Sequence, residues 1–557
     1  MTIRLSGATL IDPTQSPDET AGDLWIDGAR IVGPPADGRP ADSELALPDH
    51  LVMAGAIDIH SHIAGGKVNL GRLLAASDHR DHAEAAGEGG RRGGGGLATP
   101  ASFTTGYRYA RMGYTTAFEP AMVAANARAT HLEMADVPIL DKGAYVMLGN
   151  EEFLLRRLAA GAGQVEINDY VAWMVRATAA HAVKVVNAGG ISAFKFNRRG
   201  LGIDEPGPHH GVTPRAIIRT LARAVHELGI PHPLHVHCND LGIPGNVETT
   251  LATIEAAEGF PIHLTHVQFH SYGTEGKRRF SSAAARIADA VNRNRNVSID
   301  VGQVVFGPTM TESGDTQAQF RNRVHADPDK WISMDIECDA GCGLVPFRYR
   351  DKNFVNALQW AIGLELFLLV DDPWRVFLTT DHPNGGPFAS YPQLVRLLTE
   401  RAFRAECLAR IHKAAQELSV LGGLSREYSL REIAIMTRAG PARILGLADR
   451  GTLSPGAMAD IAVYRKQSDV EAMFRTPDRV FKSGIEVARE GRIAAMPAGA
   501  TQIVRPGYDA QIERSLRRFF DDHMTVGFGH FPLSEQEILD GGGRLAAHPC
   551  RAAGAPP

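Results

Sequence analysis

Short apolar runs alternate with amphipathic segments through the middle of the chain. The runs at 55–62 (GAIDIHSH) and 376–385 (VFLTTDHPNG) predict buried strands, whereas 214–228 repeats apolar residues at helical spacing. Further strand ends lie in GYTTAFEPAM, KVVNAGG, PLHVHCND, IHLTHVQFH and VSIDVGQ, and further helices are expected at 167–181, 246–257 and 283–292. Seven strand ends separated by helices predict an α/β fold, a (β/α)8 TIM-type barrel with one strand unassigned.

The two ends of the chain have a different pattern. Short alternating strands broken by glycine are expected in residues 1 to about 50, 451–465 and 478–496, and this pattern is typical of antiparallel β structure. We therefore expect the ends to meet in one small β-sandwich made of 1–52 and 436–510, with the barrel at 53–435. Residues 511–557 are expected to be a C-terminal tail with an amphipathic start, and this tail either docks on a neighbour or is partly disordered.

Composition limits the classes of protein that fit. The net charge is −5 and there is no long basic tract, so nucleic acid is not an expected partner. The longest apolar run, 357–370, contains Gln359 and Glu365 and is too short to cross a membrane, so a buried helix or a helix–strand segment is expected there. Five scattered cysteines without a CxxC pair and an N-terminus without a signal-peptide pattern predict a cytoplasmic protein in a reducing compartment.

The first barrel strand runs into three polar residues at every second position, Asp58, His60 and His62. Residues two apart in a strand point to the same face, so both imidazoles and the carboxylate would project into one space. Two neutral histidines at a strand end are suited to bind a metal ion, and a neighbouring carboxylate can orient them. The pattern HxH after an apolar strand therefore predicts a metal site.

A lysine in an apolar strand adds to this site. Lys184, in HAVKVVNAGG, would be costly to bury as a charged ammonium group. It can be neutralised by an ion pair, or by reaction with CO2 to give a carbamate that bridges two metal ions. Lys195, in ISAFKFN, is the competing candidate, and Lys184 is preferred.

Two later strands deliver further histidines. PLHVHCND contains His235 and His237, and the residue nearer the carboxyl end of the strand, His237, is preferred as the ligand. By the same reasoning His266 is preferred over His263 and His270 in IHLTHVQFH, although neither motif excludes its other histidines.

Asp381 ends the last predicted barrel strand and precedes a turn rich in proline and glycine. A carboxylate next to a pair of cations stays ionised and can exchange protons with water whose pKa the metal lowers. Asp381 is therefore the candidate catalytic acid and base.

The order HxH, strand lysine, two strand-end histidines and a final aspartate resembles the amidohydrolase superfamily, and GTLSPGAMADIAVY resembles its sandwich-domain signature. Longer motifs over roughly residues 1–500 resemble the A subunits of formylmethanofuran dehydrogenases and of bacterial formyltransferase/hydrolase complexes. These motifs are GAIDIHSHIAGGKVNLGR, TGYRYARMGYTTAFEPAM, HVHCNDLGIPGNVETTL, THVQFHSYGTEGKRRF, IDVGQ, QWAIGLELFLLVDDP and LTTDHPNGGPF.

The resemblance implies hydrolysis of the N-formyl group of a methanofuran-type carrier to formate and amine, in a complex with formyltransferase-type and other subunits. It implies two zinc ions held by His60, His62, carboxylated Lys184, His237 and His266, with Asp381 as acid and base. An archaeal-type relative would run the same chemistry toward condensation. A cyclic-amide hydrolase and a non-catalytic scaffold are the alternatives.

The resemblance also raises the question of what holds the anionic tail of the carrier. The glycine-rich segment 87–99 (GEGGRRGGGGLAT) is expected to be a loop over the barrel mouth. Its arginines, or Arg198 and Arg199, are candidates for binding that tail.

Overall fold

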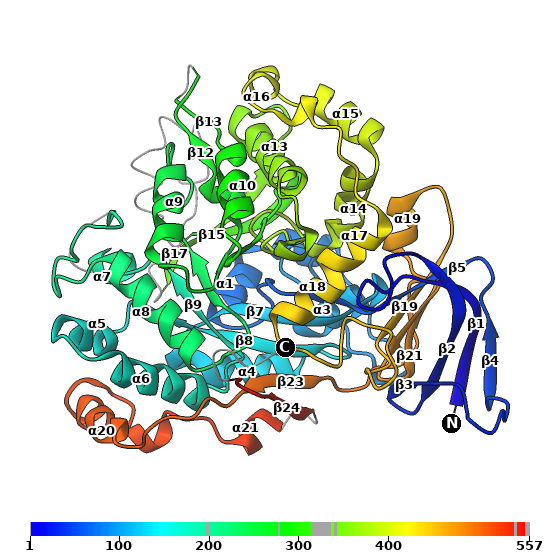
Figure 1. Cartoon of the computed structure of the whole chain (residues 1–557), viewed down its shortest axis with the longest axis horizontal. Helices are drawn as coiled ribbons and strands as arrows, with labels where there is room; N and C mark the ends of the chain where they lie inside the picture. The colour runs from blue at the N-terminus through cyan, green and yellow to red at the C-terminus, as the bar shows by residue number, and fades with distance from the viewer. Residues whose placement is uncertain are drawn as a thin grey trace.

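A barrel of parallel strands forms the centre of the molecule (Figure 1). The computed structural model describes residues 2–194, 200–276, 279–313, 336–338, 342–539 and 543–551. The barrel strands in order are β6 (Ala56–Asp58), β7 (Tyr114–Met122), β8 (Asp141–Leu148), β9 (Ala182–Val186), β10 (Leu234–His237), β11 (Ile262–Leu264), β14 (Val297–Asp300) and β18 (Val376–Phe377). A parallel bridge between Ser61 and His382 joins the first and last strands beyond their ends. The predicted barrel is confirmed.

The strand that the sequence left unassigned is β8, with the sequence DKGAYVML. Its start carries Asp141, Lys142 and Gly143, and this disguises the apolar run that follows. All three residues are nevertheless buried. The strand is therefore a core strand whose charges are satisfied inside the protein.

Helices cover the outside of the barrel. The four predicted helices are observed as α6 (Gln164–Ala177), α8 (Pro214–Glu227), α9 (Val247–Ala256) and α10 (Ala284–Arg293). The apolar run 357–370 lies in a buried helix, α13 (Phe354–Leu369). The other helices before α13 are α1 (Gly66–Leu74), α2 (Ala76–Asp81), α3 (Ser102–Arg111), α4 (Ala127–Ala135), α5 (Glu152–Ala159) and α7 (Gly190–Phe194). After α13 follow α14 (Tyr391–Thr399), α15 (Arg401–Arg410), α16 (Lys413–Glu417), α17 (Leu430–Ala434), α18 (Gly440–Ile444) and α19 (Val470–Arg475).

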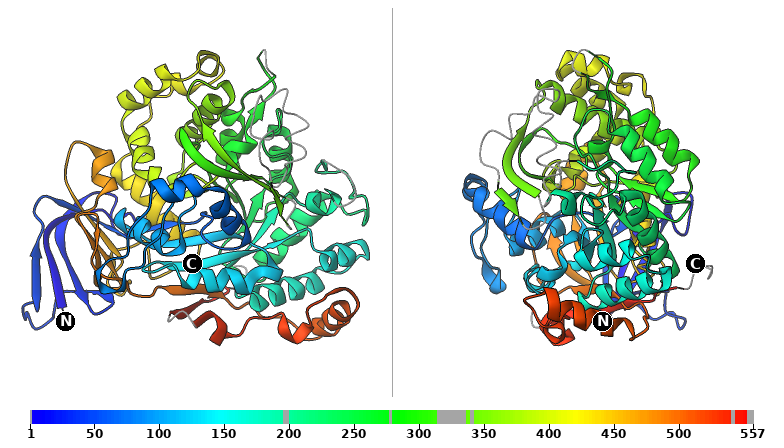
Figure 2. Two further views of the ribbon diagram at one scale, coloured as in Figure 1. Left: turned by 180° about the vertical axis from the view of Figure 1, so that it is seen from behind. Right: turned by 90° about the vertical axis from the view of Figure 1, so that its left-hand side faces the viewer.

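Strands from distant parts of the sequence share a second sheet beside the barrel (Figures 1 and 2). Its early strands are β1 (Thr2–Leu10), β2 (Thr20–Asp27), β3 (Arg30–Val32), β4 (Ser43–Ala46) and β5 (His50–Ala54). Its late strands are β19 (Ile461–Arg465), β20 (Arg479–Lys482), β21 (Ile485–Arg489) and β22 (Arg492–Ile493). The late group joins the early one through antiparallel pairing of β19 with β5. This topology supports the predicted composite domain, whose boundaries stay a prediction.

The chain passes from the composite sheet into the barrel at Gly55, between β5 and β6. A side chain at this position would collide with Thr115 on the neighbouring strand β7, so the close approach of the two sheets requires glycine. The Gly55 N–H donates to the carbonyl of Asp460 (2.7 Å), which precedes β19. The junction therefore links both halves of the composite sheet to the first barrel strand.

The described residues after 499 pack against the barrel of their own chain, although 500–510 was expected in the composite β-sandwich and 511–557 as a tail. Strands β23 (Ala500–Val504) and β24 (Arg544–His548) are parallel to each other, and β23 pairs with β8 at Lys142. The amphipathic segment forms α20 (Ile512–His523), which buries Ile512, Leu516 and Phe520 and lies beside α6 (Figures 1 and 2). The short helix α21 (Glu535–Leu539) follows.

A small antiparallel sheet lies next to the loop after β18. It contains β15 (Gly307–Ser313), β16 (Ile336–Cys338) and β17 (Cys342–Tyr349). The Thr309 hydroxyl donates to the Pro383 carbonyl, and the Tyr349 hydroxyl donates to the Asn384 carbonyl (2.9 Å). This sheet therefore holds the turn that follows Asp381. Two further short strands, β12 (Tyr272–Gly273) and β13 (Ser281–Ser282), form a hairpin.

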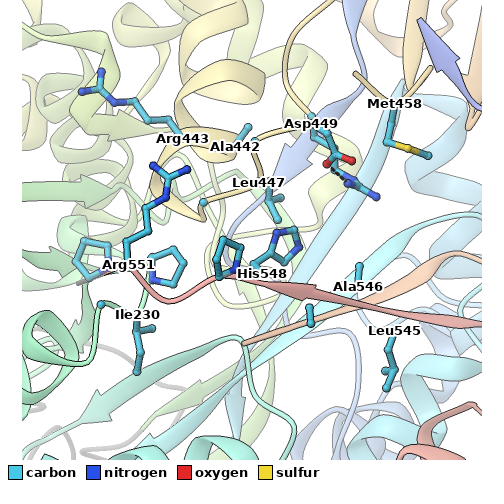
Figure 3. A pocket seen from close by; sticks show the side chains of 18 of the residues that line it. Ile230, Ala442, Arg443, Leu447, Asp449, Met458, Leu545, Ala546, His548 and Arg551 are labelled. Carbon is cyan, nitrogen blue, oxygen red and sulfur yellow. Dashed lines mark hydrogen bonds and ion pairs between the residues drawn. The ribbon is translucent and has the colours of Figure 1, made fainter. Parts of the chain in front are cut away.

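A large cavity of about 830 Å³ lies at the end of the barrel where the strands begin, just before β10 and β11 (Figure 3). Its floor includes Pro231, Pro233 and Pro261, and its cationic groups include Arg443 on α18 and Arg551 near the C-terminus. Asp449 also lines the cavity, and it is paired with Arg450.

Among the described residues, no helix combines the length and apolar character that crossing a membrane requires.

A buried group of ion pairs joins β8, the composite sheet and β23. The Asp141 carboxylate lies 2.6 Å from Arg450 Nη2 and 2.8 Å from Lys482 Nζ, and it accepts a hydrogen bond from the Ala500 N–H (2.7 Å). Lys482 Nζ also lies 2.6 Å from Asp460. Each of these charges faces an opposite one, so removing a single partner would leave an unpaired charge in the interior.

We expect Asp141→Asn to lower the free energy of unfolding by about 3–5 kcal/mol, because Arg450 and Lys482 would lose a buried counterion. The control is Asp289→Asn, which removes an exposed pair with Arg293 and should cost less than about 1 kcal/mol. Urea unfolding followed by circular dichroism measures both variants. Equal urea midpoints for Asp141→Asn and Asp289→Asn would contradict the structural role of Asp141.

The same pairs predict a pH dependence of stability. Burial alone would raise the pKa of Asp141, but the charges of Lys482 and Arg450 hold it well below its ordinary value. A depressed folded-state pKa stabilises the protein above the unfolded value of about 3.9, and this stabilisation is lost as the pH falls below it. The stability difference between wild type and Asp141→Asn should therefore stay constant from about pH 7 to pH 5 and narrow only near about pH 4. If the difference in free energy of unfolding between the two proteins already narrows between pH 7 and pH 5, this assignment is wrong.

Candidate metal centre

His60, His62 and Asp381 meet at the mouth of the barrel, as the sequence predicts. His60 Nε2 lies 2.9 Å from Asp381 Oδ1, and His62 Nε2 lies 3.3 Å from the same oxygen. All three side chains are buried. Asp381 adopts a left-handed backbone conformation (φ 51°), which an L-residue rarely adopts outside turns and functional sites. The HxH pattern and the final aspartate thus converge from the two strands that close the barrel.

A second cluster contains His237, His266 and His270, whose ligand atoms lie within 4.8 Å of one another. His237 ends β10, and His266 follows β11 with a left-handed backbone (φ 38°). A side chain at Gly302 would collide with His266, so glycine is required beside this histidine. His270, which the sequence left as an alternative, lies at the end of a short 3₁₀ turn, and its ring stacks on that of His266 (5.2 Å).

Lys184 is buried on β9 and pairs in register with His235 on β10. Its positive charge contributes to lowering the pKa of His237, His266 and His270. Lys184 therefore lies level with His235, on the strand next to the one that ends at His237, and its charge also contributes to lowering the pKa of His235 and His263. The alternative, Lys195, lies outside the described residues.

The alternative histidines His235 and His263 lie deeper in the barrel. His235 Nε2 lies 2.9 Å from His60 Nδ1, and His263 Nε2 lies 3.1 Å from Asp300 Oδ2. His60, His235 and Asp300 also have the spacing of a metal site. Their polar atoms, however, are already engaged with one another, so this group is a hydrogen-bonded layer beneath the mouth.

The two clusters at the mouth contain buried polar atoms without hydrogen-bond partners among the described residues. A buried nitrogen or carboxylate oxygen without a partner is costly, and a cation is the partner that a group of such acceptors lacks. The residues therefore fit a metal centre better than a hydrogen-bonded network. In the second cluster these atoms are His237 Nε2, His266 Nδ1 and both ring nitrogens of His270. In the first, His60 Nε2 and Asp381 Oδ1 contact each other without hydrogen-bond geometry.

Burial keeps the second cluster uncharged. It lowers the pKa of His266 to about 3 and the pKa of His237 and His270 well below the ordinary value. Burial alone would raise the pKa of Asp381, but His266 and His60 hold it well below its usual range. Neutral imidazoles next to an ionised carboxylate are the protonation states that metal binding requires.

Glu119 and Asp300 hold the candidate ligands in position, and neither was predicted from the sequence. Glu119 lies 3.1 Å from His62 Nδ1 and accepts the backbone N–H groups of Ile63 and Ala64 (2.7 and 3.1 Å). Asp300 accepts the His266 N–H (2.8 Å) and lies 3.3 Å from His60 Nδ1. Both carboxylates end or nearly end an apolar strand, the same pattern that identified Asp381.

Asp58 has a different role from the one expected. Its carboxylate accepts hydrogen bonds from the hydroxyls of Tyr109 and Tyr391 (2.7 and 2.5 Å) and from the backbone N–H of His60 (3.0 Å). It therefore fixes the backbone of the HxH segment, and no hydrogen bond to an imidazole ring is found for it in the described part of the chain.

The glycine-rich segment 87–99 is tied down at its end, where Asp78 accepts the N–H groups of Leu97, Ala98 and Thr99. Arg92 in this segment lies over the Phe103 ring (3.8 Å to the centroid). Arg198 and Arg199, the other candidates for binding the carrier, lie outside the described residues.

The comparisons with known proteins agree with the motifs. The A subunit of the formyltransferase/hydrolase complex Fhc of Methylorubrum extorquens is 42% identical, covering 99% of this chain and 100% of that protein. Protein FwdA of Methanocaldococcus jannaschii is 37% identical over 96% of each chain. The resemblance predicted from the sequence is confirmed.

Solved structures give the same result. A chain in the crystal structure of the formyltransferase/hydrolase complex FhcABCD from Methylorubrum extorquens, in complex with methylofuran, matches with a TM-score of 0.92, 41% identity, and coverage of 99% of this chain and 100% of that one. A D-aminoacylase matches with a TM-score of 0.51 at 15% identity, covering 89% of this chain and 98% of that one, and so shares the fold. A model of the amidohydrolase family matches residues 44–495. The chain therefore belongs to the amidohydrolase family.

Proposed function

We propose that this protein hydrolyses the N-formyl group of a formylated methanofuran-type carrier, giving formate and the free amine, as one component of a formyltransferase/hydrolase complex. The likeness to the A subunit of the Fhc complex over the full length of both chains supports this substrate and this assembly. The observation that carries the proposal is the convergence of His60, His62 and Asp381 beside His237, His266 and His270, because this donor set suits metal-assisted amide hydrolysis.

The proposed cofactor is a pair of zinc ions. His60, His62, carboxylated Lys184, His237 and His266 would hold the two ions. His270 is a further candidate ligand, because its ring nitrogens are buried without partners among the described residues. Zinc, when bound, would act as a Lewis acid on the formyl oxygen and lower the pKa of a water molecule.

The residues of this chain would carry the proton transfers. Asp381 is held ionised, so Oδ1 can accept a proton from the water that attacks the formyl carbon. The protonated carboxyl group then gives this proton to the departing nitrogen, since an amide anion is too basic to leave. One water molecule is consumed, the C–N bond breaks, and formate, a primary amine and one proton result. Glu119 and Asp300 hold the ligand-bearing segments in place during this cycle.

The likeness to FwdA supports a second candidate, in which the same site condenses formate with the amine. Both directions use the same residues, so variants of the site affect them equally. A cyclic-amide hydrolase remains an alternative that an assay on dihydroorotate or hydantoin tests.

We expect Asp381→Asn to reduce formate release by a factor of about 10²–10⁴, because asparagine cannot relay the proton. The assay measures formate from a formylated methanofuran-type carrier with the assembled complex. Asp204→Asn, an exposed aspartate that pairs with Arg215, is the matched control and should keep wild-type activity. Turnover close to wild type in Asp381→Asn would refute the assigned role.

We expect Lys184→Ala to lose formate release and to bind fewer than the two zinc ions proposed per wild-type chain. Added acetate should restore part of the activity, because a free carboxylate can occupy the place of the lysine carbamate. His237→Ala is the control, since it should lose activity without being restored by acetate. Metal analysis and formate release measure both. A wild-type protein without zinc would favour the scaffold alternative.

A further inference from the structure

A smaller cavity lies at the same end of the barrel as the metal centre. Its volume is about 350 Å³, and it is lined from β8 by Met147 and Leu148 and from β9 by Val186, two residues after Lys184. Much of the remaining lining comes from α5, α6 and α20. This volume is within the range of small-molecule binding sites. Segments distant in sequence thus enclose a space large enough for a small ligand.

Aromatic rings form much of the wall, and they pack against one another. Phe153 contacts Tyr170 (ring centroids 4.9 Å apart) and Phe519 (5.3 Å), and Trp173 stacks on Phe531 (5.7 Å). Phe520 of α20 also lines the cavity. Rings held by their neighbours present fixed faces, and the face of an aromatic ring attracts a cation.

The carboxylate of Glu151, a partly buried residue, lines this aromatic cavity. Glu151 Oε2 accepts the backbone N–H groups of Gly149 and Asn150 (2.8 and 3.1 Å), whereas Oε1 is buried without a hydrogen-bond partner in the described part of the chain. The neighbouring Glu152 is already paired with Arg156 and His210. Burial raises the pKa of Glu151 to about 7, as expected for a carboxyl group held away from water and from opposite charges.

The charged residues in the described lining of the cavity are all acidic. Among the described residues, its lining contains Glu151 and Glu152 but no lysine, arginine or histidine. The large cavity at the other end of the barrel is richer in positive groups, since Arg443 and Arg551 line it and the one carboxylate in its described lining, Asp449, is paired with Arg450 (Figure 3). An organic cation would therefore prefer the aromatic cavity, and an anion would be repelled from it.

We propose that the aromatic cavity is a binding site for an organic ammonium ion with a flat apolar body. The ammonium group would pair with Glu151 Oε1, and the body would pack between the aromatic side chains. The cation supplies a partner for this carboxylate oxygen, and the rings add a favourable interaction with its charge. Binding at this site does not depend on the hydrolase reaction and is measurable without turnover.

The test is calorimetric titration of the full chain with benzylamine, with benzyl alcohol as the neutral analogue and benzoate as the anionic one, at about pH 8, where a carboxyl group is ionised. We expect benzylamine to bind at least about tenfold more tightly than benzyl alcohol, and benzoate not to bind at this site. Equal affinity for benzylamine and benzyl alcohol, or no heat with either, would overturn the proposal.

Glu151→Gln should weaken benzylamine binding about tenfold and leave benzyl alcohol unchanged, because the amide keeps the shape and loses the charge. Unchanged benzylamine affinity would overturn the assignment. If this variant folds poorly, two variants of Met524, at the exposed rim of the cavity, provide the test. Met524→Lys should weaken benzylamine binding by charge repulsion, and Met524→Gln should not. Equal affinity in these two variants would also overturn the proposal.

Discussion

The structure depends on keeping imidazole rings uncharged inside a closed barrel. Protonated histidines so close together would repel one another, and burial removes the water that would screen them. Neutral rings solve this problem but leave ring nitrogens that need partners. In the deeper layer, a ring nitrogen of His235 contacts His60 and a ring nitrogen of His263 contacts Asp300. At the mouth His237, His266 and His270 leave nitrogens without a partner in the described part of the chain, and this difference in depth separates a structural layer from a candidate metal centre.

The alternation of side chains along each strand predicted which face a side chain points to, but not how deep in the barrel it lies. His60, His62 and Asp381 were found because each follows an apolar strand at the end where barrel chemistry occurs. His270 lies on a 3₁₀ turn, where alternation gives no information, so the sequence could not rank it against its neighbours. Strand β8 was missed because its first residues are charged, and their pairing with distant residues becomes visible only in the fold.

Carboxylates behind the ligands were harder to predict for a related reason. Glu119 sits in a strand whose other residues are mostly apolar, and nothing in the sequence shows that it meets His62. Asp300 is similar, since its partners include His60 after β6 and His266 after β11. These contacts join residues far apart in the sequence, so local patterns do not reveal them. The barrel prediction, in contrast, needed only local periodicity and was confirmed.

The pairing of β5 with β19 has a consequence for how the protein is made. The first barrel strand continues directly from β5, whose neighbour in the composite sheet is synthesised about four hundred residues later. Until the ribosome has released that late segment, one edge of the early strands lacks its partner. Contacts so distant in sequence form slowly and leave sheet edges open in the meantime. A late part of the chain, β19 to β22, therefore completes the sheet against which the first barrel strand is fixed.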